Sequence, residues 1–119
     1  PVNDGTFVLT RGFDQCLILY PLDEWKKVEG QLGSLSSIKV RHRNFVRSIV
    51  RCAIHVKYDS QGRIAIPENL LEYAKIDNNV AVIGMIKKIE IWSPNLLNDN
   101  GSDDLIDGDY EDLANEINF

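Results

Sequence analysis

The sequence predicts an α+β fold that is mainly β and is built from two similar halves with short helices. Short runs of β-branched and aromatic residues alternate with turn residues, which is typical of strands. A shift of 72 positions also superposes two hairpin patterns, with the pairs Gly12 and Gly84, Leu17 and Ile89, Leu19 and Ile91, and Tyr20 and Trp92. We expect two related hairpins in one body, since 119 residues with 44% hydrophobic content can bury one core.

In the first half, a hairpin precedes a helix. Residues 7–10 and 16–20 are predicted strands that turn around Gly12, and Pro21 ends the second strand. Apolar residues then recur at three-residue spacing, which predicts an amphipathic helix with Leu22, Trp25 and Val28 on one side. This helix fades into a linker rich in glycine and serine at 33–37.

A basic helix is expected next, over residues 40–52. One stripe of it is apolar and comprises Phe45, Val46, Ile49 and Val50. On another face, arginines repeat every four residues: Arg43, Arg47 and Arg51. We interpret these arginines as a secondary basic face, which is either solvated or in contact with phosphate or with an acidic neighbouring subunit.

The second half contains a projecting turn and the second hairpin. Strands are predicted at 52–59, 64–66, 80–83 and 89–92, and a helix at 67–76. The last two strands form the hairpin, which turns near Lys87 and Lys88. Pro94 is expected to close the folded body.

The charge of the chain is divided between a basic body and an acidic tail. The net charge is −5, but residues 95–119 hold eight acidic residues and no base. Residues 1–94 therefore carry +3, and the basic residues concentrate in 39–63. Such a local basic field favours an anionic partner. The tail has few large apolar residues and dense charge, so we expect it to be disordered, either solvated or competing for the basic surface.

The segment DSQGRIAIP, residues 59–67, is the most informative in the chain. Asp59 can accept backbone N–H bonds two residues on, and Gly62 tolerates positive φ, so both are interpreted as turn-shaping residues. Pro67 suits the first turn of a helix because its missing N–H would be unpaired there. The turn presents Arg63, whose guanidinium fork matches phosphate oxygens or the acceptors of guanine. Three exposed neighbours would add phosphate and groove contacts: Lys57, Ser60 and Gln61.

Two arginines have a structural interpretation as well. Arg63 can pair with Asp59 and merely stiffen the turn. Arg11 aligns with Ile83 in the repeat, so the repeat does not require charge at that position. We expect Arg11 to have a structural or subunit-contact role.

No pattern in the sequence points to catalysis. The cysteines and histidines stand alone, without a second metal ligand or a catalytic partner at close spacing: Cys16, Cys52, His42 and His55. We expect reduced cysteines in the core, no metal site, no cofactor, no small-molecule substrate and no enzymatic activity. No run approaches the roughly 18 apolar residues of a membrane helix, so we expect no membrane partner.

The turn and its surroundings resemble a known family. The spacing from Asp59 to Arg63 resembles the looped-hinge pattern of AbrB-like DNA-binding domains. Further blocks narrow the resemblance to the MraZ family of bacterial transcription regulators, namely FVLTRGFDQCLILYPLDEW, NFVRSIVRCA, DSQGRIAIP, LLEYAKI and IEIWS. The resemblance implies AbrB-like swapped-hairpin or double-psi-like β-barrel half-repeats that assemble into a ring. It also implies sequence-specific DNA binding, as a repressor, at the promoter of a bacterial division and cell-wall gene cluster.

The resemblance also divides the chain. Residues 1–33 would be the C-terminal part of the first AbrB-like repeat, 34–52 the linker and basic helix, 53–94 the second repeat and 95–119 the acidic tail. At the 72-residue offset, the counterparts of Asp59 and Arg63 would precede Pro1. We therefore expect an N-terminally shortened chain that lacks the first turn and its arginine.

Two classes of function stay open. The first is a cytoplasmic, nucleoid-associated regulator that binds double-stranded promoter DNA as a homo-oligomer, because several weak turns acting together gain affinity. The alternative is an antitoxin-like protein-interaction module that uses the AbrB-like fold and the acidic tail to bind a basic protein. The fold alone does not decide between them.

Overall fold

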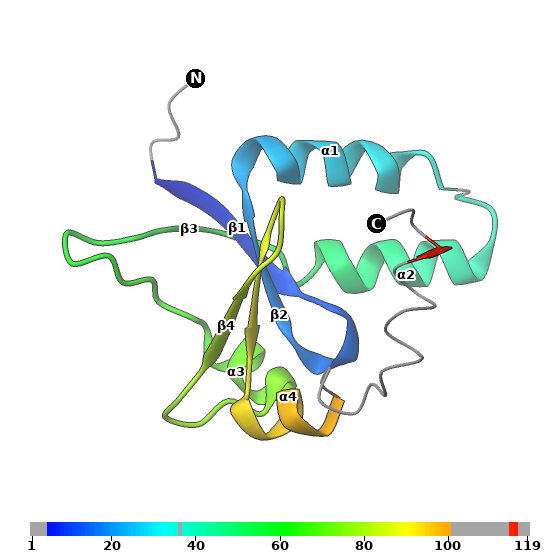
Figure 1. Cartoon of the computed structure of the whole chain (residues 1–119). Helices are drawn as coiled ribbons and strands as arrows, with labels where there is room; N and C mark the ends of the chain where they lie inside the picture. Colours follow the sequence, from blue (N-terminus) through cyan, green and yellow to red (C-terminus); the bar gives the residue numbers. More distant parts are fainter. Residues whose placement is uncertain (1–4, 36, 101–114, 117–119) are drawn as a thin grey trace.

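A computed structural model describes residues 5–35, 37–100 and 115–116. Within them, five strands form one antiparallel sheet in the order β3-β1-β2-β5-β4 (Figure 1). The strands are β1 (Thr6–Arg11), β2 (Leu17–Pro21), β3 (Ile54–Lys57), β4 (Ala81–Gly84) and β5 (Ile89–Trp92). The helices are α1 (Leu22–Gly33), α2 (Val40–Val50), α3 (Glu68–Ala74) and α4 (Pro94–Asn100), with a 3₁₀ turn at Phe13–Gln15. The α+β class is confirmed, but the described helices hold more residues than the strands, so "mainly β" is wrong.

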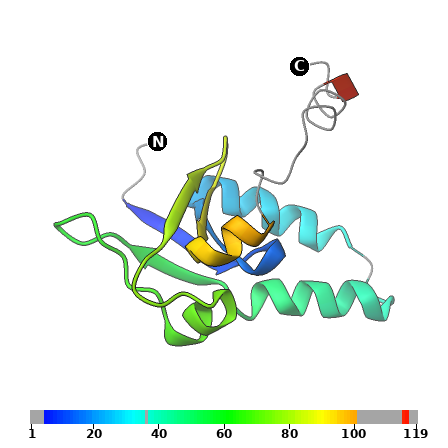
Figure 2. The ribbon, with the colours of Figure 1, turned by 60° about the horizontal axis from the view of Figure 1, so that its bottom comes forward.

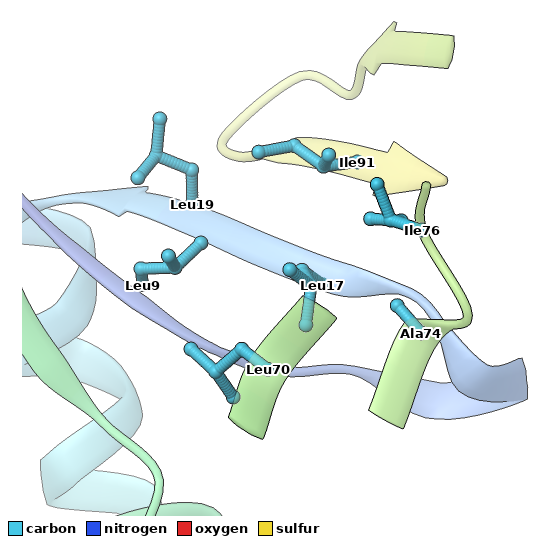
Figure 3. Close-up of a cluster of buried hydrophobic side chains, with 7 residues drawn as sticks. All are labelled: Leu9, Leu17, Leu19, Leu70, Ala74, Ile76 and Ile91. Atoms are coloured by element: carbon cyan, nitrogen blue, oxygen red, sulfur yellow. The ribbon is translucent and has the colours of Figure 1, made fainter. Parts of the chain in front are cut away.

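One face of the sheet packs on α3. Because side chains alternate along a strand, Leu9 in β1 and Leu17 in β2 point to the same side. Both are fully buried against Leu70 and Ala74 of α3 (Figure 3). Helix α3 ends where Lys75 adopts a left-handed conformation, with φ 55°.

The opposite face of the sheet is covered by the other three helices. Trp25 of α1 is buried and lies tilted against Tyr20 at a ring-centroid distance of 5.6 Å. Thr10 of β1 is buried and donates from Oγ1 to the carbonyl of Ile49 in α2, at 3.0 Å. Leucines of α4 pack against a second cluster around Trp92. The two faces together hold the hydrophobic core.

The two hairpins are related by a local pseudo-twofold axis between β2 and β5. Leu17 pairs with Ile91, which is the counterpart of Leu19, and Leu19 pairs with Ile89, which is the counterpart of Leu17. At the centre, Ile18 pairs with Glu90, which is its own counterpart 72 positions later. The repeat that the sequence predicts is therefore visible as two adjacent hairpins in one sheet.

In the first strand of each hairpin, the structural correspondence between the two halves differs by one residue from the 72-residue offset. Arg11 pairs with Leu17 across the first turn, whereas Gly84 pairs with Ile89 across the second. The second turn is thus one residue shorter, and the structural counterpart of Arg11 is Gly84. The sequence alignments of Arg11 with Ile83 and of Gly12 with Gly84 are therefore wrong, because a constant offset ignores this deletion.

Pro94 does not close the folded body. Instead it begins α4, whose residues Leu96 and Leu97 pack on the second cluster. The repeat contains the missed signal, because an offset of 72 places Leu22, where α1 begins, on Pro94. The remainder of the predicted acidic tail, apart from 115–116, lies outside the described residues.

Residues 64–66 do not form the predicted strand. They pair with no strand in the described residues, although one edge of the outer strand β3 has no partner there. Ile64 and Ile66 instead pack their side chains against the core cluster beside α3. The apolar alternation at these positions reflects burial and not pairing in a ladder.

Candidate nucleic-acid interface

The turn at Asp59–Arg63 projects from an edge of the sheet. Strand β3 is an outer strand of the sheet and runs into the loop that leads to α3. Figures 1 and 2 both show this loop extending away from the body, on the side opposite α2. All five residues of the turn are exposed. The loop is therefore accessible to a large partner.

Asp59 organises the turn with both its backbone and its carboxylate. Its backbone N–H donates to the carbonyl of Arg63 at 2.7 Å, and its carbonyl accepts from Gly62 at 3.0 Å. Its Oδ1 accepts from the backbone N–H groups of Gln61 and Arg63, both at 2.9 Å. Gly62 has φ +78°, a conformation in which a side chain would be strained. These contacts fix the course of the backbone without help from the core.

The side chain of Arg63 pairs with the same carboxylate. Its Nε donates to Oδ2 of Asp59 at 3.0 Å, while 70% of the Arg63 side chain stays exposed. This contact uses Nε and leaves the two terminal amino groups outside it. The pair thus holds the guanidinium at the turn, and a planar fork of donors remains for an external acceptor.

The carboxylate of Asp59 is stabilised in its charged form. Backbone N–H donation from Arg63, then from Gln61, lowers its pKa below the ordinary value of 3.8. The charge that holds Arg63 is therefore present at any pH near neutrality.

The other predicted contact residues lie along the same projection. Lys57 ends β3, where it pairs with Thr6, and its side chain is exposed. Ser60 and Gln61 are at the exposed tip. Pro67 lies just before the first helical residue of α3, as its N-cap, and not within the first turn. The structure thus brings the predicted DNA-contacting residues together on one loop.

Tyr58 at the base of the turn was not singled out in the sequence. Its ring lies tilted against Phe7 at a centroid distance of 6.2 Å. It also covers Gly5, where an added Cβ would lie 3.0 Å from the ring. Tyr58 connects the start of β1 to the projecting loop.

The arginines of α2 do not form one uniform basic face. Arg43 is half-buried, and its Nη1 donates to the carbonyls of Ser37 and Ile38, which precede the helix. Arg47 and Arg51 are exposed. Since α2 and the projecting loop lie on opposite sides of the body (Figure 2), these arginines and Arg63 do not share a surface within one chain.

Arg11 has a structural contact. Its guanidinium lies 4.1 Å from the centroid of the Tyr73 ring, and the hydroxyl of Tyr73 donates to the carbonyl of Gly12 at 2.8 Å. Together these contacts fasten α3 to the first hairpin. The described residues contain no group of three or more potential metal ligands from His, Cys, Asp and Glu. They also contain no helix that is long and apolar enough to cross a membrane.

The chain matches a family model described as "MraZ protein, putative antitoxin-like" twice, over residues 2–48 and 49–99. The chain belongs to the MraZ family. The two matches agree with the two pseudo-symmetric hairpins, since each match contains one of them.

Curated relatives give the same family. A protein of Halothermothrix orenii named transcriptional regulator MraZ is 43% identical over 108 residues, covering 91% of this chain and 74% of the relative. One from Thermoanaerobacter sp. with the same name is 40% identical over 111 residues, covering 93% of this chain and 76% of the relative. The relatives of this MraZ-family chain are thus named as regulators of transcription and not as enzymes.

Proposed function

We propose that the chain is a DNA-binding transcriptional regulator in which Arg63 contacts DNA. The observation that carries the proposal is the exposed turn at Asp59–Arg63, in a chain whose relatives are named transcriptional regulators. A guanidinium held by a rigid turn loses less side-chain entropy on binding than a free one. Its terminal amino groups match either a phosphate or the paired acceptors of guanine.

The neighbours of Arg63 would make different kinds of contact with the DNA. Lys57 is a cation suited to phosphate, and phosphate contacts supply affinity and register without reading sequence. Ser60 and Gln61 at the tip are neutral donors and acceptors suited to base edges or sugar. Sequence preference would therefore come from Arg63 and the tip, and salt-dependent affinity from Lys57.

One turn supplies too little surface for tight binding, so the proposal includes a homo-oligomer. Strands β3 and β4 each have one edge without a partner in the described residues, and such edges favour pairing with another copy. A ring, as the family resemblance implies, would repeat the turn, and linked turns on repeated DNA sites gain affinity through effective concentration. From the same resemblance, the target would be the promoter of a division and cell-wall gene cluster, and the effect repression.

The experiment is a fluorescence anisotropy titration of the full chain with its own upstream promoter DNA and with scrambled DNA. Arg63→Ala should weaken promoter binding by about 1–3 kcal/mol per functional contact. Lys26→Ala removes an exposed cation from α1, away from the loop, and serves as the matched control. Equal affinities of the Arg63→Ala and Lys26→Ala variants for the promoter, at equal oligomer size, would refute the assignment.

The competing class is a protein-interaction module, and the family description includes the words "antitoxin-like". In that case, the promoter DNA would bind no better than scrambled DNA. Loss of folding in Arg63→Ala, measured by circular dichroism, would instead favour the stiffening role of the Asp59 pair.

A further inference from the structure

A pocket lies between helices α1 and α2, on the face of the sheet that both helices cover. Figures 1 and 2 both show α1 running away from the sheet and α2 running back beside it. The pocket is lined by apolar residues of both helices, namely Val28, Leu32 and Leu35 of α1 and Phe45 and Ile49 of α2. Phe45 is 38% exposed, and the other four are half-buried. The apolar stripes of the two helices thus face one another without filling the space between them.

The pocket has the size and composition of a small-molecule site. Its volume is about 340 Å³, and ligand pockets in proteins range from about 300 to 1,000 Å³. The sheet provides its floor, where Thr10 of β1 and Ile18 of β2 are both buried. The hydroxyl of Thr10 donates to the carbonyl of Ile49, so the floor is connected to α2. The pocket is therefore formed in advance of any ligand.

Lys88 places a positive charge beside this apolar lining. It is half-buried, and its Nζ lies 5.9 Å from the centroid of the Tyr20 ring, which also borders the pocket. Arg11 borders the pocket too, but its guanidinium lies over the ring of Tyr73 in α3, on the other face of the sheet. The lining contains no Asp or Glu, and Lys88 belongs to no ion pair within the part of the chain that the structure describes. An apolar pocket with one cation beside it is complementary to an amphipathic anion.

We propose that this pocket binds a small amphipathic carboxylate, with the carboxylate at Lys88 and the apolar body between α1 and α2. A hydrogen bond between an ammonium and a carboxylate is about twice as strong as one between neutral groups. Covering the half-buried stripes of the two helices removes further apolar surface from water. No residue of the Asp59–Arg63 turn lines the pocket, so this site goes beyond the proposed DNA contact and does not depend on it.

Titration of the full chain with octanoate tests the proposal, followed by NMR of methyl groups and by calorimetry. The methyl signals of Leu32 and Ile49 should shift together and saturate, because both residues line the pocket. Those of Val56, which packs on the core cluster beside α3, should stay in place. Octanol has a similar apolar chain without the charge and should bind more weakly. The absence of saturable shifts at the pocket overturns the proposal, and so do shifts centred on Met85 in the neighbouring groove.

Lys88→Gln and Lys87→Gln form a matched pair of variants. Lys88 borders the pocket, whereas its exposed neighbour Lys87 does not. Lys88→Gln should weaken octanoate binding by about tenfold or more, because a hydrogen bond to a charged group is lost. It should leave the binding of octanol unchanged. Lys87→Gln should change neither affinity by more than about twofold, since an exposed charge contributes little. Equal octanoate affinities of the two variants overturn the proposal.

Leu32→Trp tests the position of the ligand independently of charge. Leu32 is half-buried, so a larger ring at this position would occupy the pocket and should remove the binding of both octanoate and octanol. Lys26→Trp adds the same ring at an exposed position of α1 outside the pocket and should leave both unchanged. The midpoint of urea unfolding checks that each variant is folded. Undiminished octanoate binding by a folded Leu32→Trp variant overturns the proposal, and if this variant does not fold, the two lysine variants decide.

Sedimentation with and without octanoate distinguishes the ligand from a second copy of the chain. A carboxylate that enters an open pocket should leave the size of the oligomer unchanged. A smaller oligomer in the presence of octanoate would mean that a neighbouring copy fills the pocket, and this result overturns the proposal.

Discussion

Ile18 in β2 pairs with Glu90 in β5, the residue that corresponds to it in the other half of the repeat. A residue that faces its own counterpart marks the centre of a two-fold relationship, so the two hairpins meet about this pair. The equivalence is not exact in chain length, because the second turn is one residue shorter than the first. This difference makes the two halves physically distinct and therefore separable by mutation.

Gly12→Ala should destabilise the fold, whereas Gly84→Ala should not. An added Cβ at Gly12 would lie 2.7 Å from Cγ1 and 2.8 Å from Cδ1 of Ile18, which is buried. Overpacking of this kind costs about 1–3 kcal/mol in the free energy of unfolding. At Gly84, nothing lies within 4 Å of the added Cβ. Urea unfolding of both variants measures the difference, and equal midpoints would contradict it.

Gly5→Ala should reduce the free energy of promoter binding by more than it reduces the free energy of unfolding. The new Cβ would lie 3.0 Å from the Tyr58 ring, and Gly5 has φ +87°, so the base of the projecting loop must shift. Gly30→Ala is the control, because it is in α1 with nothing within 4 Å and should stabilise the helix by about 0.5–1 kcal/mol. Anisotropy titration, together with urea unfolding, separates the two effects. Promoter affinity that falls only in proportion to stability would rule out a positioning role for Tyr58.

Asp59→Asn should keep more promoter affinity than Asp59→Ala. The amide oxygen of Asn can still accept the backbone N–H groups of Gln61 and Arg63, but it loses the charge that holds the Arg63 guanidinium. Alanine loses both contacts. The check is an anisotropy series at fixed salt, and an Asn variant as weak as the Ala variant would show that only the charge matters.

The carboxyl of Asp59 should titrate below 3.8 in the folded chain, as followed by NMR of its side chain. The folded pKa is lowered, so the stabilisation is fully present above the unfolded pKa and is lost as the pH falls through the folded one. Turn order should therefore be independent of pH between 5 and 8. A folded pKa at or above the ordinary value would contradict the hydrogen bonding in the turn.

Deletion of residues 101–119 should raise the affinity for DNA of any sequence. The deletion removes seven acidic residues and no base, so the net charge changes from −5 to +2. It spares α4, whose leucines belong to the core. The gain should shrink as salt rises, because the repulsion is screened. Binding that is unchanged at low salt, or improved at the promoter alone, would argue against an electrostatic effect of this segment.

The parts of the fold that the sequence predicted are those governed by local pattern. The hairpins at β1–β2 and β4–β5 follow from turn residues between β-branched runs, and α2 follows from its apolar stripe. The strand expected at 64–66 does not form: Ile64 and Ile66 pack against the core cluster instead of entering a ladder, and a local apolar alternation does not distinguish the two. Helix α4 was missed because the repeat offset was applied to the strands and not continued into the residues after them.

In the candidate site, too, the sequence predicted the features that depend on local residues and missed those that depend on distant contacts. The projection of Arg63 and the backbone role of Asp59 follow from turn chemistry, which acts over five residues. The half-buried state of Arg43 depends on carbonyls that precede α2, and the spacing of the arginines does not reveal it. The covering of Gly5 by Tyr58 joins residues more than fifty positions apart, so only the folded chain brings it to light.

The pairing of β2 with β5 also has a consequence for the order in which the chain folds. Each hairpin closes a turn of a few residues, which takes microseconds. The pairing of β2 with β5 joins strands about 70 residues apart in the sequence. Closing so long a loop costs chain entropy before the hydrogen bonds between the strands can form. We therefore expect each half to form its hairpin early, and the pairing of β2 with β5 to be among the slow steps of folding.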